Sequence, residues 1–155
     1  EEIQRLKEQK FIAPNLSELV NVKQLEKFFS GQLFKRIRNA KKIYREQRFN
    51  IFLPASQFTA DEEKKKLLEG ETVAVQGVID IFFEETDGNI VLCDYKTDRL
   101  TPEELKDAAL AQKTLSERHG EQLGYYAMAL ERIVGRRPDR ICIFSLHAGR
   151  EFDVI

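Results

Sequence analysis

The sequence has no long apolar segment, almost no net charge and very little cysteine. No hydrophobic run approaches the roughly 18 residues that a transmembrane helix needs. The first ten residues, EEIQRLKEQK, form a charged helical pattern and do not resemble a signal peptide. The formal net charge of −1 at pH 7 gives no overall basic field for nucleic acid. That balance counts only mildly against a DNA-binding domain, because the rest of a complex can supply basic surface.

Several common site chemistries are also missing. Cys93 and Cys142 both lie in apolar strand patterns. Buried free thiols in a reducing cytoplasm explain them better than a disulfide or a metal pair. His119 and His147 have no partners at the spacing of a zinc site. No glycine-rich phosphate loop occurs, so we do not expect this chain to bind ATP itself.

The length and composition fit one soluble domain. A chain of 155 residues with 42% hydrophobic and 33% charged residues can bury a sizeable core. The sequence starts at Glu1 and its single methionine is Met128, so we expect a fragment of a larger protein or a processed product. We predict one domain over residues 1–155, with a helical part over 1–42 and a core over 43–155.

Hydrophobic periodicity predicts helices, three strands, two helices and two further strands. The predicted helices are 1–10, 21–30 (with Leu25, Phe28 and Phe29 inward), 32–42, 101–117 and 119–134. The predicted strands are 43–53, 73–83, 90–95, 140–146 and 151–155. The polar segment 55–70 is predicted to be a loop. This order is typical of an α/β (α+β) layer fold with a mixed sheet.

The most informative segment is the pair of apolar strands around Asp87-Gly88. Asp-Gly between apolar runs is a strong hairpin signal. A three-residue loop over 86–88 with Gly88 in the left-handed conformation would place Asp80 opposite Asp94. A two-residue loop would instead place Asp80 opposite Tyr95, on the other face.

With the three-residue loop, Asp80, Asp94 and Lys96 share one face of the hairpin. Two neighbouring carboxylates repel each other unless a hard divalent cation lies between them. Lys96 could then orient water or stabilise charge on a phosphate. We expect the acidic face to carry also Val78, Phe82 and Leu92, and the opposite face to carry Ile79, Ile81, Phe83, Val91, Cys93 and Tyr95.

Each piece of this pattern has an ordinary structural explanation as well. Asp-x-Lys alone is usually a surface ion pair, but Gly77-x-x-Asp80 at a matching register favours a metal site. Gln122 and Tyr126 lie four residues apart on one helix face, either as a boundary pair or aimed at the acids. The segment 32–42 is rich in basic residues, which either form a solvated helix face or contact DNA phosphates. These residues are Lys35, Arg36, Arg38, Lys41 and Lys42.

In this order, Gly77-x-x-Asp80, Asp94-Tyr-Lys96-Thr97 and Gln122-x-x-x-Tyr126 resemble the RecB-type branch of the PD-(D/E)xK nucleases. The likeness is greatest to the C-terminal nuclease domains of the bacterial AddA family, the A subunits of ATP-dependent helicase/nucleases. It runs from about Asn21 to the end of the chain. The supporting phrases are IYREQRF at 43–49, VQGVID at 75–80, DYKTD at 94–98 and QLGYYAMAL at 122–130.

The resemblance implies a restriction-endonuclease-like core and a DNA exonuclease that processes double-strand breaks for recombinational repair. By motif, Asp80 and Asp94 are metal ligands for Mg²⁺ or Mn²⁺, Lys96 is catalytic, and Gln122 and Tyr126 complete the catalytic set. Glu46 has a supporting role, and DNA contacts fall on Lys35, Arg36 and Arg38.

The same resemblance implies partners and a location. The substrate is a DNA strand fed from a duplex end, ATP serves only the helicase part, and the AddB subunit forms a heterodimer in the bacterial cytoplasm. The family also has an upstream helix whose histidine helps to bind metal, and this sequence lacks it, so we expect the fragment to start after it. The alternative is a catalytically inactive nuclease-like module that binds DNA or protein.

Overall fold

A mixed five-stranded sheet organises the chain, in the spatial order β1-β2-β3-β4-β5. The computed structural model describes residues 2–11, 13 and 21–154. Neighbouring strands are antiparallel except β3 and β4, which are parallel and joined through helices. The α/β fold is therefore confirmed. The strands are β1 (Lys42–Pro54), β2 (Thr72–Glu84), β3 (Ile90–Lys96), β4 (Arg140–Ser145) and β5 (Arg150–Asp153).

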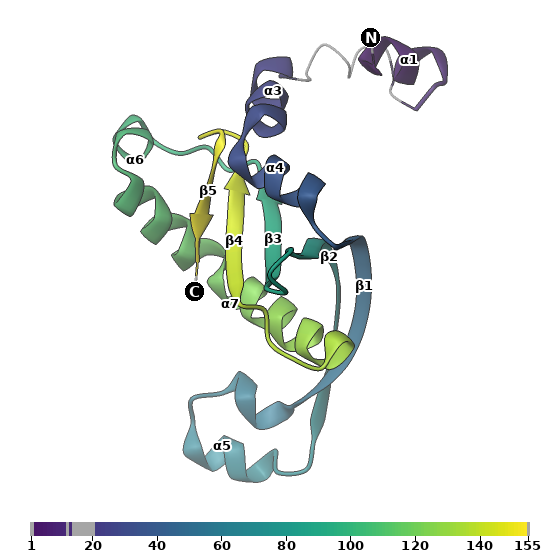
Figure 1. Ribbon diagram of the computed structural model, residues 1–155. Coiled ribbons are helices and arrows are strands. Elements are labelled where there is room, and N and C mark those ends of the chain that lie inside the picture. The colour runs from purple at the N-terminus through teal and green to yellow at the C-terminus, as the bar shows by residue number, and fades with distance from the viewer. Residues whose placement is uncertain (1, 12, 14–20, 155) are drawn as a thin grey trace.

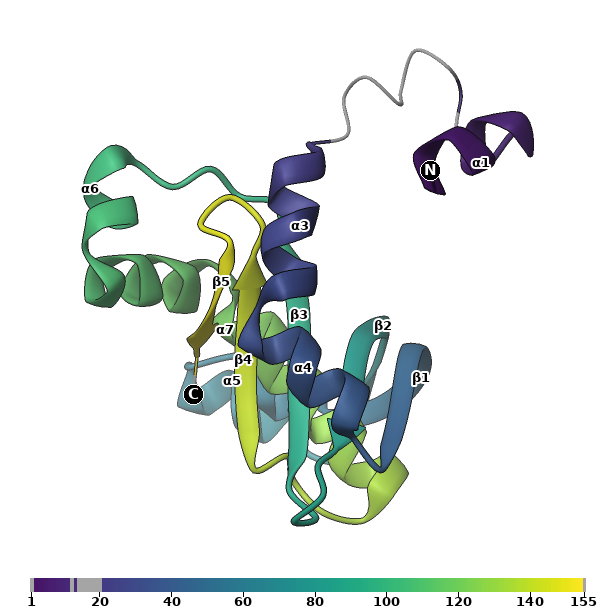
Figure 2. The ribbon, with the colours of Figure 1, turned by 45° about the horizontal axis from the view of Figure 1, so that its top comes forward.

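Helices cover both faces of the sheet, as Figures 1 and 2 show. The long helix α7 packs on one face, where its residues join a core with Leu92 and Ile143. Helix α4 packs on the other face against Ile81 and Cys93. The helical elements are α1 (Glu2–Glu8), α3 (Val22–Ser30), α4 (Gln32–Asn39), the 3₁₀ turn η1 (Ala55–Phe58), α5 (Glu62–Leu67), α6 (Pro102–Lys106) and α7 (Ala108–Val134).

The boundary between the two late helices was predicted in the wrong place. The helix that starts at Thr101 ends at Lys106, and α7 then runs without a break through position 118. Asp107 causes the break, because its carboxylate accepts hydrogen bonds from the backbone N–H groups of Ala109 and Leu110 and so caps α7. The predicted end of α7 at Gly135 is confirmed, since Gly135 has a φ of 82° in the left-handed region.

Smaller differences follow from local capping and exposure. The predicted loop 55–70 contains η1 and α5, which Asp61 caps. Phe29, expected inward, is 55% exposed, and α4 stops at Asn39 because β1 begins at Lys42. Position 1 of the predicted first helix and position 155 of the predicted last strand lie outside the described residues.

The predicted three-residue turn between β2 and β3 is confirmed. The N–H of Glu85 donates to the carbonyl of Asn89 at 2.8 Å, and the N–H of Gly88 donates to the carbonyl of Glu85 at 3.0 Å. Gly88 has a φ of 93°, which glycine adopts without steric cost. The paired residues run from Glu84–Ile90 to Ile81–Cys93. One further step in this register places Asp80 opposite Asp94.

Beyond that point the side chains of β2 change face. Phe82 packs in the core under α7 and Ile81 on the other side, as alternation requires, but Ile79 also lies under α7. The expectation that Ile79 faces away from α7 was therefore wrong, and Val78 is 40% exposed. The break coincides with Glu46 of β1, whose φ of 50° interrupts the β1–β2 ladder between Arg45–Ile81 and Gln47–Ile79.

No helix in the described part of the chain is long and apolar enough to cross a membrane.

The cap at Asp107 yields a stability prediction. Asp107→Ala removes both hydrogen bonds to the start of α7, and we expect it to lower the free energy of unfolding by about 1 kcal/mol. Asp107→Asn keeps a side-chain oxygen in place and should lose far less. Urea denaturation of the three proteins measures the difference, and equal losses in both variants would contradict the capping role.

Candidate active site

The end of β3 carries a buried carboxylate. Asp94 is 2% exposed, and it lies on the α7 side of the sheet together with Leu92. The parallel neighbour β4 continues alongside it, pairing Asp94 with Ile143 and Lys96 with Ser145. A carboxylate so deep in the protein requires a compensating positive charge.

Lys96 supplies that charge, and it also starts a chain of contacts with α7. Its Nζ lies 2.6 Å from Oδ2 of Asp94. The same Nζ donates to Oε1 of Gln122 at 2.8 Å, and the amide of Gln122 donates to the hydroxyl of Tyr126 at 2.8 Å. The predicted residues Asp94, Lys96, Gln122 and Tyr126 therefore form one connected group.

Asp80 reaches the same group from β2. Its Oδ2 accepts a hydrogen bond from the backbone N–H of Tyr95 at 3.0 Å. This bond forms just where the β2–β3 ladder ends, so the carboxylate occupies the gap between the two strands. Val78 and Lys96, which were expected to face each other, are not among the paired residues because β2 has left β3 by that point.

The electrostatics of the group are those of a crowded acidic site. Burial raises the pKa of Asp94 above its ordinary value, and the Asp80 carboxylate adds to the rise, while Lys96 opposes it by hydrogen bond and charge. Burial likewise raises the pKa of Tyr126, with a further contribution from the charge of Asp94. In both cases burial is the largest cause, and the neighbouring carboxylates add negative charge to the same small region.

Comparison with known proteins identifies the family of this chain. Residues 2–151 match the PD-(D/E)XK nuclease superfamily. The chain belongs to that superfamily. It is also 35% identical over 149 residues, or 96% of its length, to the A subunit of an ATP-dependent helicase/nuclease from Acetivibrio thermocellus. The proteins of the same name from Clostridium botulinum strains Hall and Okra are 39% and 38% identical over 137 residues, or 88% of this chain.

The chain spans only 10–11% of the length of these relatives. The predicted resemblance to the nuclease domain of helicase/nuclease A subunits is thus confirmed for this segment.

Nucleases of the PD-(D/E)XK superfamily generally depend on a divalent metal, and the residues present fit one. Within the described ranges no three His, Cys, Asp or Glu side chains converge as ligands. Asp80 and Asp94 provide two carboxylates beside each other, one of them buried. A hard cation such as Mg²⁺ is typically bound by one or two carboxylates, with waters and phosphate oxygens as its other ligands.

The remaining predicted site residues lie farther from this group. Glu46 is exposed and makes no hydrogen bond or ion pair with the described residues, so its supporting role stays a prediction. Arg36 pairs with Glu85 at 2.8 Å and Glu151 at 3.4 Å, which compensates its charge within the domain. Helix α4 lies on the sheet face opposite α7. DNA contacts by Lys35 and Arg38, which are exposed, remain a prediction.

A second polar cluster, which was not predicted from the sequence, lies beside the first. Asp98 lies 3.1 Å from Nε2 of His119 and 3.6 Å from a guanidinium nitrogen of Arg118. His119, expected at the surface start of a helix, is in the middle of α7 and its side chain is only 18% exposed. Its spacing of three residues from Gln122 and seven from Tyr126 places all three on one helix face. A predicted helix that continued unbroken through position 118 would have shown that these three residues share a face.

The cluster gives a pH-dependent prediction. Partial burial raises the pKa of Asp98, but the close contact with His119, a backbone hydrogen bond and the charge of Arg118 together lower it by more, so the net pKa lies below the ordinary value. A depressed carboxyl pKa stabilises the fold above the unfolded value of about 3.9. We therefore expect Asp98→Asn to cost less than about 1 kcal/mol of unfolding free energy at neutral pH, since the pair is partly solvent-screened.

As the pH falls through the lower folded pKa of Asp98, this difference should vanish. Urea titrations at several values from about pH 2 to about pH 7, a range on either side of the ordinary carboxyl pKa of about 3.9, measure the difference between the wild type and Asp98→Asn. Glu117→Gln is the matched control, because Glu117 forms an exposed pair with Lys113 on the same helix. A difference that persists at the lowest pH would contradict the assignment.

Proposed function

We propose that this domain hydrolyses DNA phosphodiester bonds with Mg²⁺ or Mn²⁺ as cofactor. The observation that carries the proposal is the connected group of Asp80, Asp94, Lys96, Gln122 and Tyr126, which brings residues from two strands and one helix to a single point. Two carboxylates, a lysine and their hydrogen-bonded supports are the side chains that metal-assisted hydrolysis of a phosphate ester needs.

The residues have distinct roles in this proposal. Asp80 and Asp94 hold the metal, which when bound polarises the phosphate and lowers the pKa of water. Lys96 neutralises Asp94 in the absence of substrate, and its ammonium then donates to the attacking water or the phosphate oxygens. Gln122 fixes the position of Lys96 from α7, and Tyr126 in turn fixes Gln122.

The wider setting follows from the relatives, which are named as the A subunits of ATP-dependent helicase/nucleases. We propose that the domain acts as an exonuclease on a DNA strand that a helicase part supplies at the expense of ATP. The setting is double-strand break processing in the bacterial cytoplasm, where the heterodimer partner is of the AddB type.

A non-catalytic nuclease-like module that binds DNA or protein is the second candidate, and one contact favours it. The 2.6 Å contact between Lys96 and Asp94 already compensates the buried carboxylate, so the fold does not need a metal ion to be stable. The two candidates differ in whether loss of the Asp80 charge affects cleavage.

The central test replaces each charged group with a neutral amide side chain. Asp80→Asn retains an oxygen to accept the N–H of Tyr95, and Lys96→Gln retains a donor toward Asp94. In the full-length protein, we expect each to reduce Mg²⁺-dependent DNA cleavage at least about a hundredfold, because metal binding or charge stabilisation is lost. Gel assays of end-labelled DNA measure cleavage, and helicase assays measure unwinding.

Unwinding should remain unchanged in both variants, and the thermal unfolding temperature should remain unchanged in Asp80→Asn. Lys96→Gln leaves the buried Asp94 carboxylate without its counter-charge, so we expect a lower unfolding temperature for this variant and measure its cleavage well below that temperature. Lys42→Gln is the matched control, since Lys42 is an exposed strand lysine without an ion pair among the described residues. Normal cleavage by Asp80→Asn or Lys96→Gln would refute the catalytic proposal and support the non-catalytic module.

Gln122 allows a separate test of the support from α7. Gln122→Leu keeps the side-chain size but breaks the hydrogen bonds to Lys96 and Tyr126. Supporting residues around a metal site typically contribute 10–100-fold to activity, and we expect a loss of kcat on the order of tenfold to a hundredfold. Gln112→Leu, on the exposed face of the same helix, should leave kcat unchanged, whereas equal effects in both variants would rule out a specific role.

A further inference from the structure

Strands β1 and β2 continue as a two-stranded arm beyond the sheet. Pairing of β2 with β3 stops at Ile81–Cys93, but pairing of β1 with β2 continues to Pro54–Thr72. The arm, residues 47–79, carries η1 and α5 at its far end, as Figure 1 shows. It leaves the sheet next to Asp80, so its first residues border the proposed catalytic group.

A cleft of about 450 Å³ lies between the arm and α7. It contains two members of the catalytic group, Gln122 and Tyr126, in its helix wall. A volume of this size is in the range of pockets that hold small ligands, about 300–1,000 Å³. The lining residues are Phe49, Val75, Gln76 and Gly77 from the arm and Arg118, Glu121, Gln122, Tyr125 and Tyr126 from α7.

The two sides of the cleft meet next to the catalytic group. Ring contacts join its two sides: Phe49 meets Tyr126 edge-on at 5.6 Å between ring centres. Gly77 permits this approach, because a Cβ there would lie 2.9 Å from the Phe49 ring and 3.5 Å from that of Tyr126.

Tyr125 forms a rigid aromatic surface in the helix wall. Its ring stacks on Phe58 of η1 with ring centres 5.8 Å apart and an interplanar angle of 21°. Phe58 is not among the residues that line the cleft, so it supports Tyr125 from outside. The hydroxyl of Tyr125 donates to Glu121 at 2.9 Å, which fixes the ring in its plane. Fixed aromatic rings are the usual stacking partners of unpaired bases.

Arg118 adds a positive charge one helical turn from Gln122 in the same wall. Asp98 approaches one guanidinium nitrogen at 3.6 Å. A guanidinium has five N–H donors, so this single carboxylate contact leaves donors that can bind a phosphate oxygen.

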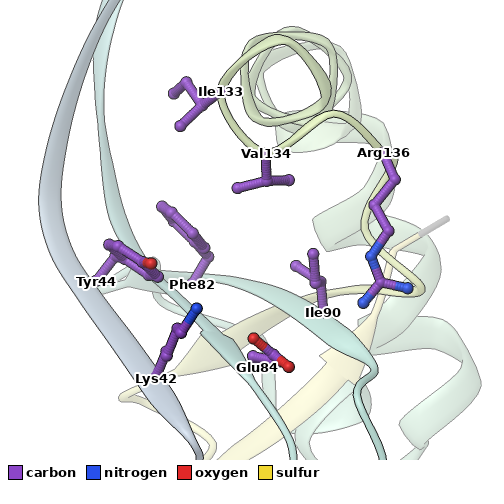
Figure 3. Close-up of a pocket in the computed structure, with 8 residues that line it drawn as sticks. All are labelled: Lys42, Tyr44, Phe82, Glu84, Ile90, Ile133, Val134 and Arg136. Atoms are coloured by element: carbon purple, nitrogen blue, oxygen red, sulfur yellow. The ribbon is translucent and has the colours of Figure 1, made fainter.

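A second cavity of about 370 Å³ lacks these features. Figure 3 shows it between the start of β1 and the end of α7, lined by Lys42, Tyr44, Phe82, Glu84, Ile90, Ile133, Val134 and Arg136. It shares no residue with the catalytic group. It does contain an exposed tyrosine stacked on a phenylalanine, Tyr44 on Phe82 at 4.4 Å, and so provides an internal control.

We propose that the cleft between the arm and α7 binds the nucleotide next to the cleaved phosphate. Its base stacks on Tyr125, and its phosphate binds Arg118. This inference rests on the proposed nuclease function and extends it, because it assigns the recognition of unpaired DNA to residues outside the catalytic group. A base inside a duplex already stacks on its neighbours, so we expect Tyr125 to take an unpaired base.

The first experiment combines a base deletion with a side-chain deletion. Binding of a single-stranded oligonucleotide to the full-length protein is measured by fluorescence anisotropy without divalent metal, with one abasic residue placed at each position in turn. We expect one position at which the abasic residue raises Kd fivefold to about a hundredfold, the range for one base stacked on an aromatic ring.

In Tyr125→Ala the abasic residue at that position should have no further effect. Tyr44→Ala should keep the full effect of the abasic residue. If Tyr125→Ala does not fold, Phe58→Ala removes the support from behind the ring and should reduce the effect partially. The proposal is overturned if no position is sensitive, or if Tyr125→Ala and Tyr44→Ala behave alike.

The second experiment addresses Arg118. Arg118→Gln should raise KM for single-stranded DNA with little change in kcat, and should lower the slope of log Kd against log salt by about 0.7, the value for one phosphate contact on a single strand. Arg118→Lys should restore the slope. An unchanged slope in Arg118→Gln overturns the phosphate contact.

The binding measurements are independent of catalysis. Failure of the wild-type protein to cut DNA in Mg²⁺, with the abasic effect intact, would reject the proposed function and retain a single-strand binding cleft. Normal cleavage without any abasic effect would reject the cleft alone.

Discussion

The departure of β2 from β3 after Ile81 determines where every residue of the site lies. Up to that residue the two strands pair in a regular antiparallel ladder set by the turn at Gly88. Beyond it, the N–H of Tyr95 has no strand partner on β2 and bonds the carboxylate of Asp80. The same separation gives Asp94 and Lys96 access to α7 and leaves β1 and β2 free to form the arm. One break in backbone pairing therefore produces both the acidic site and the cleft beside it.

The two faces of the sheet therefore differ in the polar groups that they hold. On the α7 face, polar groups are arranged around a buried carboxylate, at a cost in burial that Lys96 offsets. On the α4 face, the contacts are apolar and are bordered by ion pairs of Arg36 with Glu85 and Glu151. Apolar cores cover both faces of the sheet, and the α7 face also holds the buried carboxylate of Asp94 beside its core.

Much of the site could be predicted from local signals. Asp87-Gly88 specified the turn, the turn specified the register, and the register placed Asp94 and Lys96 on the α7 side. The error at Ile79 and Val78 has a different origin, because alternation along a strand holds only while the backbone stays extended. Glu46 departs from the extended backbone conformation, and a glutamate in the sequence gives no signal of such a departure. Asp98 and His119 were missed since their meeting depends on an unbroken α7, which a wrongly placed helix boundary concealed.

The left-handed conformation of Glu46 has a cost of its own. A non-glycine residue at a φ of 50° is held about 1 kcal/mol or more above its preferred backbone state. The surrounding ladder, from Arg45–Ile81 to Gln47–Ile79, must sustain that strain. Glu46 lies opposite Asp80 in the β1–β2 register, at the point where the side chains of β2 change face. Backbone strain of this kind clusters at functional sites in proteins, and here it falls opposite Asp80, one of the two proposed metal ligands.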